Sequence, residues 1–268
     1  MQRILVGIDR SAESRQALDW AAGVASRAGA ELCAALVQPR ADEGGPPDGQ
    51  AELEALVAGT AVPVHARLLE GDPADALLAA AASEEAGLLV VGSRGAGGFA
   101  GLQLGSVANH LARITTLPLV VIPPTAADHV DHVVVGVDGS SGSLGAVAFA
   151  SDVAAALGIG ATAVYAFEPF VEWVPSNDPG SWQRHARQQV QEWVAPLEQV
   201  GVTVAIEVDR DVHPVAAIGR AVDAHPAALA VVGTRGRGGF AGLRLGRVPS
   251  QLVHHTGAAV ALVPTPLG

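Results

Sequence analysis

The first half of the chain contains a glycine-rich segment whose residue types suit the binding of an anion. Gly92 and Gly95 lie close together in it, and Gly105 and Ser106 follow further along. Glycine has no Cβ, so the backbone N–H groups of such a turn can approach a ligand closely. A helix that begins near Ser106 adds unsatisfied N–H groups, the positive end of its dipole and a hydroxyl. The chain has no lysine, and this arrangement predicts phosphate binding that needs none.

The same segment occurs again in the second half of the chain. Residues 231–246 match residues 90–105 with few changes, which repeats the glycines as Gly233, Gly236 and Gly246. A single glycine-rich stretch is more often a flexible surface loop. Two copies, each following an apolar segment typical of a strand, favour a ligand site at the carboxyl end of a parallel sheet.

Charged side chains accompany both copies of the segment. Asp9 and Asp138 each end the first apolar segment of a repeat. Either carboxylate would accept hydrogen bonds from the polar edge of a nucleoside or cap the helix that follows, and the residues leave these roles equally open. Arg94 and Arg235 lie inside the turns and are directed either at phosphate or at carboxylates.

Short apolar segments that alternate with helical ones must position these residues. Strands are expected at 2–8, 31–37, 63–69, 87–92 and 118–122, and again at 131–137, 160–167, 202–208, 228–233 and 258–263. Helices are expected at 12–28, 73–85 and 105–116, with Ser11 as the N-cap of the first. The pattern predicts an α/β protein of two doubly wound, Rossmann-like domains, each with an open five-stranded parallel-type sheet flanked by helices.

The repeats are organised as tandem domains. Residues 4–11 match residues 133–140, so two separate blocks recur in the same order. The expected domains are 1–125 and 130–268, joined by a linker that carries prolines and polar residues.

One region differs between the repeats. In the first repeat, residues 42–50 are expected to form a mobile loop. The matching region of the second is longer and holds Trp173, Trp182 and Trp193, as either a lid over a site or an added helix packed on the core.

Composition excludes several classes of protein. A net charge of −11 with no basic stripe argues against nucleic-acid binding. The absence of lysine excludes a Walker A lysine and a Schiff-base lysine, and the histidines show no metal-ligand spacing. The short apolar start predicts no signal peptide, and no apolar run is long enough to cross a membrane, so we expect a cytoplasmic protein.

The segment Gly92-x-x-Gly95-x9-Gly105-Ser106, with Asp9 closing the first strand, resembles the ATP-binding class of the universal stress protein family. The resemblance covers essentially the whole chain and implies an adenine nucleotide alpha hydrolase-like fold that binds ATP with Mg²⁺. It implies that Asp9 contacts the nucleoside. The other residues implied to contact ATP are Gly92, Arg94, Gly95, Gly105, Ser106 and Val107 around ribose and phosphates, and Leu36 and Val37 beside adenine.

The second repeat departs from the family pattern at Arg247, which stands where the family has Ser or Thr. Arg247 would either clamp phosphate or fill the cradle in place of a ligand. The remaining counterparts are Asp138, Ala166, Phe167, Gly233, Arg235, Gly236 and Gly246. We therefore expect two unequal sites, with the first repeat binding more tightly.

ATP binding without an evident catalytic base favours regulation through nucleotide-dependent contacts with a protein partner. The resemblance implies a stress response, and pairing through strand five (117–122 and 258–263), within the chain or in a homodimer. The alternatives are a slow ATPase, a flavin-binding electron carrier, and an interaction scaffold with vestigial nucleotide sites.

Overall fold

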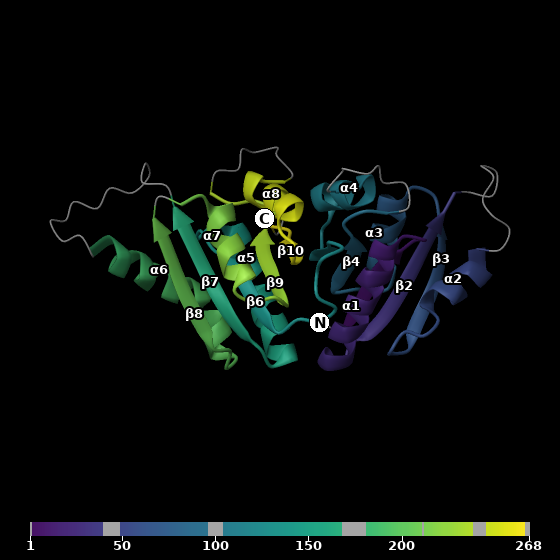
Figure 1. The fold of residues 1–268 in the computed structure, drawn as a ribbon, viewed down its shortest axis with the longest axis horizontal. Helices are drawn as coiled ribbons and strands as arrows, with labels where there is room; N and C mark the ends of the chain where they lie inside the picture. The colour runs from purple at the N-terminus through teal and green to yellow at the C-terminus, as the bar shows by residue number, and fades with distance from the viewer. Residues whose placement is uncertain are drawn as a thin grey trace. The chain divides into compact units, whose positions relative to one another are not determined.

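The computed structural model describes residues 2–39, 49–95, 104–167, 181–210, 212–237 and 245–265 (Figure 1). The chain divides into two compact units, Met1–His129 with Val253–Ala261, and Val130–Leu252 with Leu262–Gly268. None of the helices within the described ranges combines the length and apolar character needed to span a bilayer.

The first unit contains a parallel sheet in the order β3-β2-β1-β4-β5. Its strands are β1 (Arg3–Ile8), β2 (Glu31–Gln38), β3 (Val64–Glu70), β4 (Leu88–Gly92) and β5 (Leu119–Ile122). Its helices are α1 (Ala12–Ala28), α2 (Gly49–Val57), α3 (Pro73–Ser83) and α4 (Ser106–Ile114). Helix α3 packs beside α4, and helices cover both faces of the sheet (Figure 1), as the predicted doubly wound architecture requires.

The second unit repeats this arrangement, with parallel strands in the order β9-β6-β7-β8. The strands of the second repeat are β6 (His132–Gly136), β7 (Gly160–Phe167), β8 (Val204–Arg210), β9 (Ala228–Gly233) and β10 (Ala259–Val263). The helices are α5 (Ser141–Leu157), α6 (Ser181–Gln199), α7 (Pro214–Asp223) and α8 (Arg247–His255).

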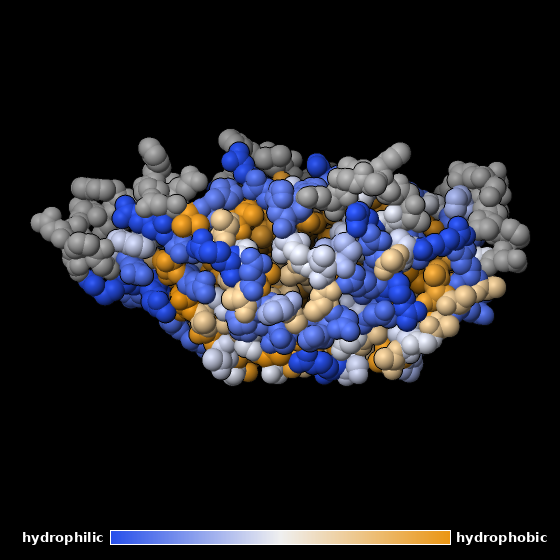
Figure 2. All heavy atoms as spheres, in the orientation of Figure 1, coloured by the Kyte–Doolittle hydropathy of each residue, from blue (hydrophilic) through white to orange (hydrophobic). Residues whose placement is uncertain are grey.

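The inner strands form because apolar residues run without interruption and are buried on both faces of the sheet, whereas β3 and β8 alternate between half-buried and exposed residues. Ile4, Leu5 and Val6 of β1 have no exposed surface. Cys33 of β2 is equally buried, and burial raises the pKa of its thiol to about 11, so it remains protonated at neutral pH. On the face shown in Figure 2, hydrophilic residues surround scattered hydrophobic ones.

The sequence predictions of the elements are largely confirmed. Each expected strand is present with both ends within two residues of its predicted position. Ser11 caps α1, since its side chain accepts a hydrogen bond from the N–H of Ser14. Helix α2 was missed, because Gly49 and Gln50 were assigned to a loop; residues 42–48 lie outside the described residues. Of the tryptophan-rich region, α6 is a helix packed on the core, while Trp173 lies outside the described residues.

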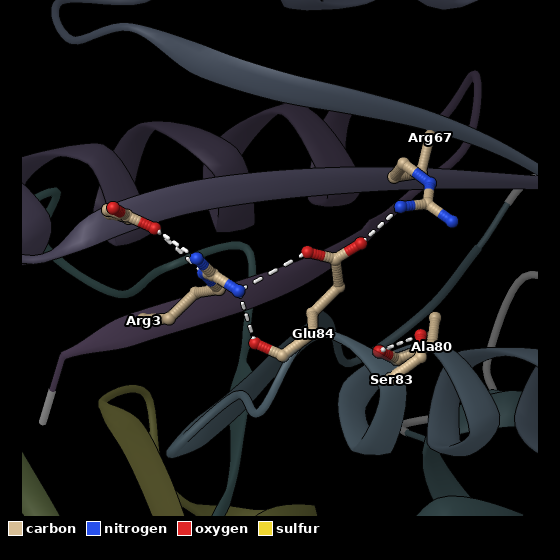
Figure 3. Close-up of polar contacts among 6 residues, drawn as sticks. Arg3, Arg67, Ala80, Ser83 and Glu84 are labelled. Carbon is tan, nitrogen blue, oxygen red and sulfur yellow. Dashed lines mark hydrogen bonds and ion pairs between the residues drawn. The ribbon is translucent and has the colours of Figure 1, made fainter.

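An ion-pair network joins the amino ends of β1 and β2 to the end of α3 (Figure 3). The Arg3 guanidinium donates to the Glu31 carboxylate at 2.8 Å and 2.5 Å, and to the Glu84 backbone carbonyl at 2.6 Å. Arg67 of β3 also pairs with the Glu84 carboxylate. Ion pairs thus link β1, β2 and β3 to the end of α3 at this edge of the first sheet.

Two histidines occupy the equivalent place in the second unit. His132 begins β6 as Arg3 begins β1, and His225 precedes Gly233 at the spacing by which Glu84 precedes Gly92. The two imidazole rings are stacked, with centroids 3.7 Å apart and planes 10° apart. His132 Nε2 also lies 2.9 Å from the Thr162 hydroxyl. A proton on His132 would place a positive charge against the stacked His225 ring.

Acid is therefore expected to lower the stability of the second unit. Burial, and then the neighbouring His225, hold the pKa of His132 below its usual value of 6.5, against an opposing effect of Asp131. The unfolded chain takes up the proton at the usual value, so the stability is complete above about pH 7 and declines as the pH falls through the unfolded pKa. Thermal unfolding at pH 8, 6.5 and 5 tests this.

The matched variants for that experiment are His132→Asn and His129→Asn. His129 is exposed beside Asp128, so its replacement should leave the acid dependence of the unfolding temperature as in the wild type. His132→Asn should reduce the dependence. Equal acid dependence in all three proteins would show that the stacked pair does not set it.

Candidate functional site

The carboxyl ends of β1 and β4 bring Asp9 and the first glycine-rich turn together. The Asp9 carboxylate accepts hydrogen bonds from the Ser11 N–H at 2.8 Å and the Ser11 hydroxyl at 2.5 Å. The N-cap of α1 is thus Ser11, and Asp9 positions it rather than capping the helix itself. A Cβ added to Gly95 would lie 2.5 Å from Asp9 Oδ2, so a larger residue here would displace the Asp9 carboxylate.

The other two glycines of the turn are required by different contacts. A Cβ on Gly92 would lie 3.0 Å from the Glu13 backbone, because the first turn of α1 packs directly on the end of β4. The Gly105 N–H donates to the Ser93 carbonyl at 2.7 Å, and a Cβ on Gly105 would lie 3.3 Å from Arg94 Cα. Helix α4 therefore starts against the turn that follows β4.

The start of α4 has no side-chain cap. Its N-cap is Gly105, whereas side chains accept hydrogen bonds from the first turns of four other helices: α1 (Ser11), α3 (Asp72), α5 (Ser140) and α7 (His213). Ser106 is exposed and Val107 is half-buried in this uncapped first turn. The N–H groups and the Ser106 hydroxyl are thus available to an anion.

A buried hydroxyl lies beside this helix start. Ser93 is 2% exposed, and its Oγ has no hydrogen-bond partner among the described residues. Burying a hydroxyl without a hydrogen-bond partner is unfavourable unless a ligand or a water molecule supplies that partner. The donors gathered here suit phosphate oxygens, which accept hydrogen bonds.

Arg94 is directed at a carboxylate. Its Nη2 lies 2.8 Å from Glu13 Oε1 on the first turn of α1, which is the carboxylate alternative of the two that the sequence left open; contact with phosphate stays a prediction. The position equivalent to Glu13 in the second repeat is Gly142, which packs against the Arg235 carbonyl. Arg235 consequently has no ion pair of this kind.

The end of β2 supplies an apolar wall and one unpaired acceptor. Leu36 is buried between Ile8 of β1 and Leu68 of β3, and Val37 is half-buried beside it. The next residue, Gln38, has a buried Oε1 that lacks a hydrogen-bond partner within the described ranges.

The second repeat reproduces the arrangement around the first-strand aspartate. Asp138 Oδ1 accepts from the Ser140 N–H at 2.9 Å, and Oδ2 accepts from the Arg237 N–H at 2.8 Å. Burial alone would raise the pKa of Asp138, but the hydrogen bonds from Ser140 and the Arg237 backbone outweigh it and hold the pKa below its usual value. Gly236 lies against the Asp138 carboxylate in the same way that Gly95 lies against the Asp9 carboxylate.

The remaining glycines of the second repeat also have counterparts in the first. The Gly246 N–H donates to the Thr234 carbonyl at 2.8 Å, and Gly233 packs against Gly142 of α5. Arg247 is exposed as the first residue of α8, and no hydrogen bond or ion pair joins its side chain to a described residue.

Comparison with known proteins identifies the family. The family model described as "Universal stress protein family" matches residues 1–123 and again residues 129–264. The chain belongs to the universal stress protein family.

This universal stress protein is similar to curated members from mycobacteria. It is 32% identical over 225 residues to universal stress protein Rv1996 of Mycobacterium tuberculosis, covering 79% of this chain and 68% of that protein. It is 37% identical over 174 residues to universal stress protein Rv2623 of the same organism, covering 62% and 57%. A crystal structure of a universal stress protein from Archaeoglobus fulgidus shares the fold, with a TM-score of 0.70, 19% identity and 98% coverage of each chain.

Three residues of this universal stress protein were missed by the sequence analysis. The pairing of β6 with β7 makes Tyr165, rather than Ala166, the counterpart of Leu36. Ala166 is half-buried, and the side chain of Phe167 lies outside what the structure describes. Trp193 of α6 and Arg237 of the second turn also reach the end of β6. The register that β6–β7 shares with β1–β2 identifies Tyr165. Trp193 belongs to the region for which the sequence left a lid over a site and an added helix as alternatives.

Proposed function

We propose that this universal stress protein binds ATP in its first repeat and that the bound nucleotide controls its contacts with a protein partner. The observation that carries the proposal is the uncapped start of α4, set against a turn with a buried, unpaired Ser93 hydroxyl. Family membership supports a role in the response to stress.

In this proposal, different residues of the first repeat contact the phosphates, the ribose and the adenine of ATP. The N–H groups at the start of α4 and the Ser106 hydroxyl would hold phosphate oxygens, with glycines at Gly95 and Gly105 allowing close approach. Asp9 would accept a hydrogen bond from the ribose. The unpaired Gln38 Oε1 would accept one from an amino group such as that of adenine. Mg²⁺ would neutralise part of the phosphate charge.

Removing the Ser106 hydroxyl is expected to weaken ATP binding by about tenfold, since a hydrogen bond to a charged group contributes about 1.5 kcal/mol or more. Isothermal titration calorimetry of the wild type and Ser106→Ala measures the change. Ser26→Ala is the matched control, because Ser26 is an exposed serine on α1. Equal affinities of Ser106→Ala and the wild type would contradict the role given to this hydroxyl.

The Arg94–Glu13 ion pair favours binding over hydrolysis. Because Glu13 already engages this guanidinium, Arg94 is not poised to stabilise a phosphoryl-transfer transition state. We therefore expect no phosphate release from ATP over hours beyond that of the Ser106→Ala variant. Release well above that background would favour the slow ATPase. A cytoplasmic location, pairing through strand five and a homodimer stay predictions.

A further inference from the structure

The end of β6 in the second repeat is covered by an aromatic side chain. Gly139 follows Asp138 with φ +74°, a conformation that favours glycine. A Cβ added to Gly139 would overlap Cζ2 of Trp193, so the indole lies directly on the Gly139 backbone. The Trp193 ring also meets the Tyr165 ring edge-on, with centroids 5.3 Å apart. The indole is thus held between the turn after β6 and the end of β7.

Arg237 covers the same place from the other side. Its guanidinium carbon lies 5.5 Å from the centre of the Trp193 ring, which is a cation–π contact. Its Nη2 would lie 2.8 Å from a Cβ on Gly139, and its backbone N–H donates to Asp138 Oδ2 at 2.8 Å. The carboxylate and the glycine beside it are therefore both engaged by groups of the chain itself.

The first repeat is built differently at both positions. Arg10 stands in place of Gly139, and its side chain pairs with Glu52 of α2. Ala96 stands in place of Arg237 and has no charged side chain. The guanidinium that lies on the indole in the second repeat therefore has no counterpart in the first.

We propose that Trp193 and Arg237 form a cap that closes the second repeat to nucleotide, so that the chain carries one open and one capped site. The inference rests on the proposed ATP site and assigns its inequality to the cap rather than to Arg247. Among the described residues, the Arg237 backbone and guanidinium and the Trp193 indole lie against Asp138 and Gly139, where a nucleoside held by Asp138 would have to bind. Arg247 is exposed at the start of α8, where it contacts none of these groups among the described residues.

Calorimetric stoichiometry with ATP tests the cap on the full chain. The wild type is expected to bind one equivalent, and Arg237→Ala to bind two, because it removes the exposed half of the cap. Trp193→Leu keeps an apolar side chain on α6 and should also raise the stoichiometry. Trp182→Leu is the matched control: Trp182 lies on the same helix under Arg210, also at 5.5 Å, and should leave one equivalent.

Each outcome separates the cap from the proposed function. Two equivalents in the wild type, or one in both wild type and Arg237→Ala, would overturn the cap while the ATP site stands. A wild type that binds no ATP would contradict the proposed function. If the wild type binds no ATP, binding of one equivalent by Arg237→Ala would support the cap. Binding of no ATP by Arg237→Ala would then overturn the cap.

Discussion

Replacing Gly105 with valine is expected to lower the affinity of the first repeat for ATP by at least about a hundredfold. The added Cβ would lie 3.3 Å from Arg94 Cα and 3.4 Å from the Ser93 carbonyl oxygen, and the branched side chain extends further. The start of α4 must then move away from the turn after β4. Two displaced hydrogen bonds to phosphate, at about 1.5 kcal/mol each, account for this loss.

The equivalent substitution in the second repeat is the control. Gly246→Val adds the same side chain 3.3 Å from the Thr234 carbonyl, where it should leave the first repeat's affinity for ATP unchanged. Circular dichroism and thermal unfolding establish that both variants fold. A folded Gly105→Val protein that binds ATP like the wild type would mean that the phosphates lie elsewhere.

Gly233→Ala is expected to destabilise the second unit by about 3 kcal/mol, the upper part of the usual range for overpacking. A Cβ at this position would lie 2.6 Å from the Gly142 carbonyl carbon and oxygen. These are backbone atoms in the first turn of α5, so they cannot turn aside as a flexible side chain does. Chemical denaturation gives the change in the free energy of unfolding.

Gly219→Ala in α7 is the control in the same unit, because it is expected to raise stability rather than lower it. Nothing lies within 4 Å of its added Cβ, and alanine is favoured over glycine inside a helix, so stability should rise by about 1 kcal/mol. If Gly233→Ala were as stable as the wild type, α5 would not pack on β9 as closely as the structure shows.

The glycines of the motif thus have separable roles. The first of each repeat, Gly92 or Gly233, allows the helix after the first strand to pack on the fourth strand of the repeat. The second, Gly95 or Gly236, lets the turn lie against the carboxylate of the aspartate that follows the first strand. In the first repeat the third, Gly105, leaves the start of α4 without a side-chain cap, which is the feature on which the proposed phosphate site depends.

The inner strands were predictable from the sequence because burial on both faces produces uninterrupted apolar runs, and β3 and β8 because their residues alternate in burial. Helix α2 was not, because it buries only Gly49 and Leu53, which lie on one face but are too few to form an extended apolar stripe. The contact of Arg94 with Glu13 depends on how α1 crosses the end of β4, which no local pattern encodes.

For the region that holds Trp193, the sequence left a lid over a site and an added helix as alternatives and did not show which groups the indole would contact. Trp193 and Gly139 are far apart along the chain, and their contact depends on where α6 packs over the sheet. Arg247, which departs from the family pattern, is exposed at the start of α8, and the proposed cap depends instead on Arg237, which stands where the first repeat has Ala96. Only the fold makes that difference meaningful, because it brings Arg237 onto the Trp193 ring.

The most direct test of the account is to denature freshly purified protein, identify any released nucleotide and count it per chain. The account predicts about one ATP per chain in the wild type and none in Gly105→Val. A wild type that releases no nucleotide and also fails to bind added ATP would contradict the account, and would leave an interaction protein whose two glycine-rich turns serve packing alone.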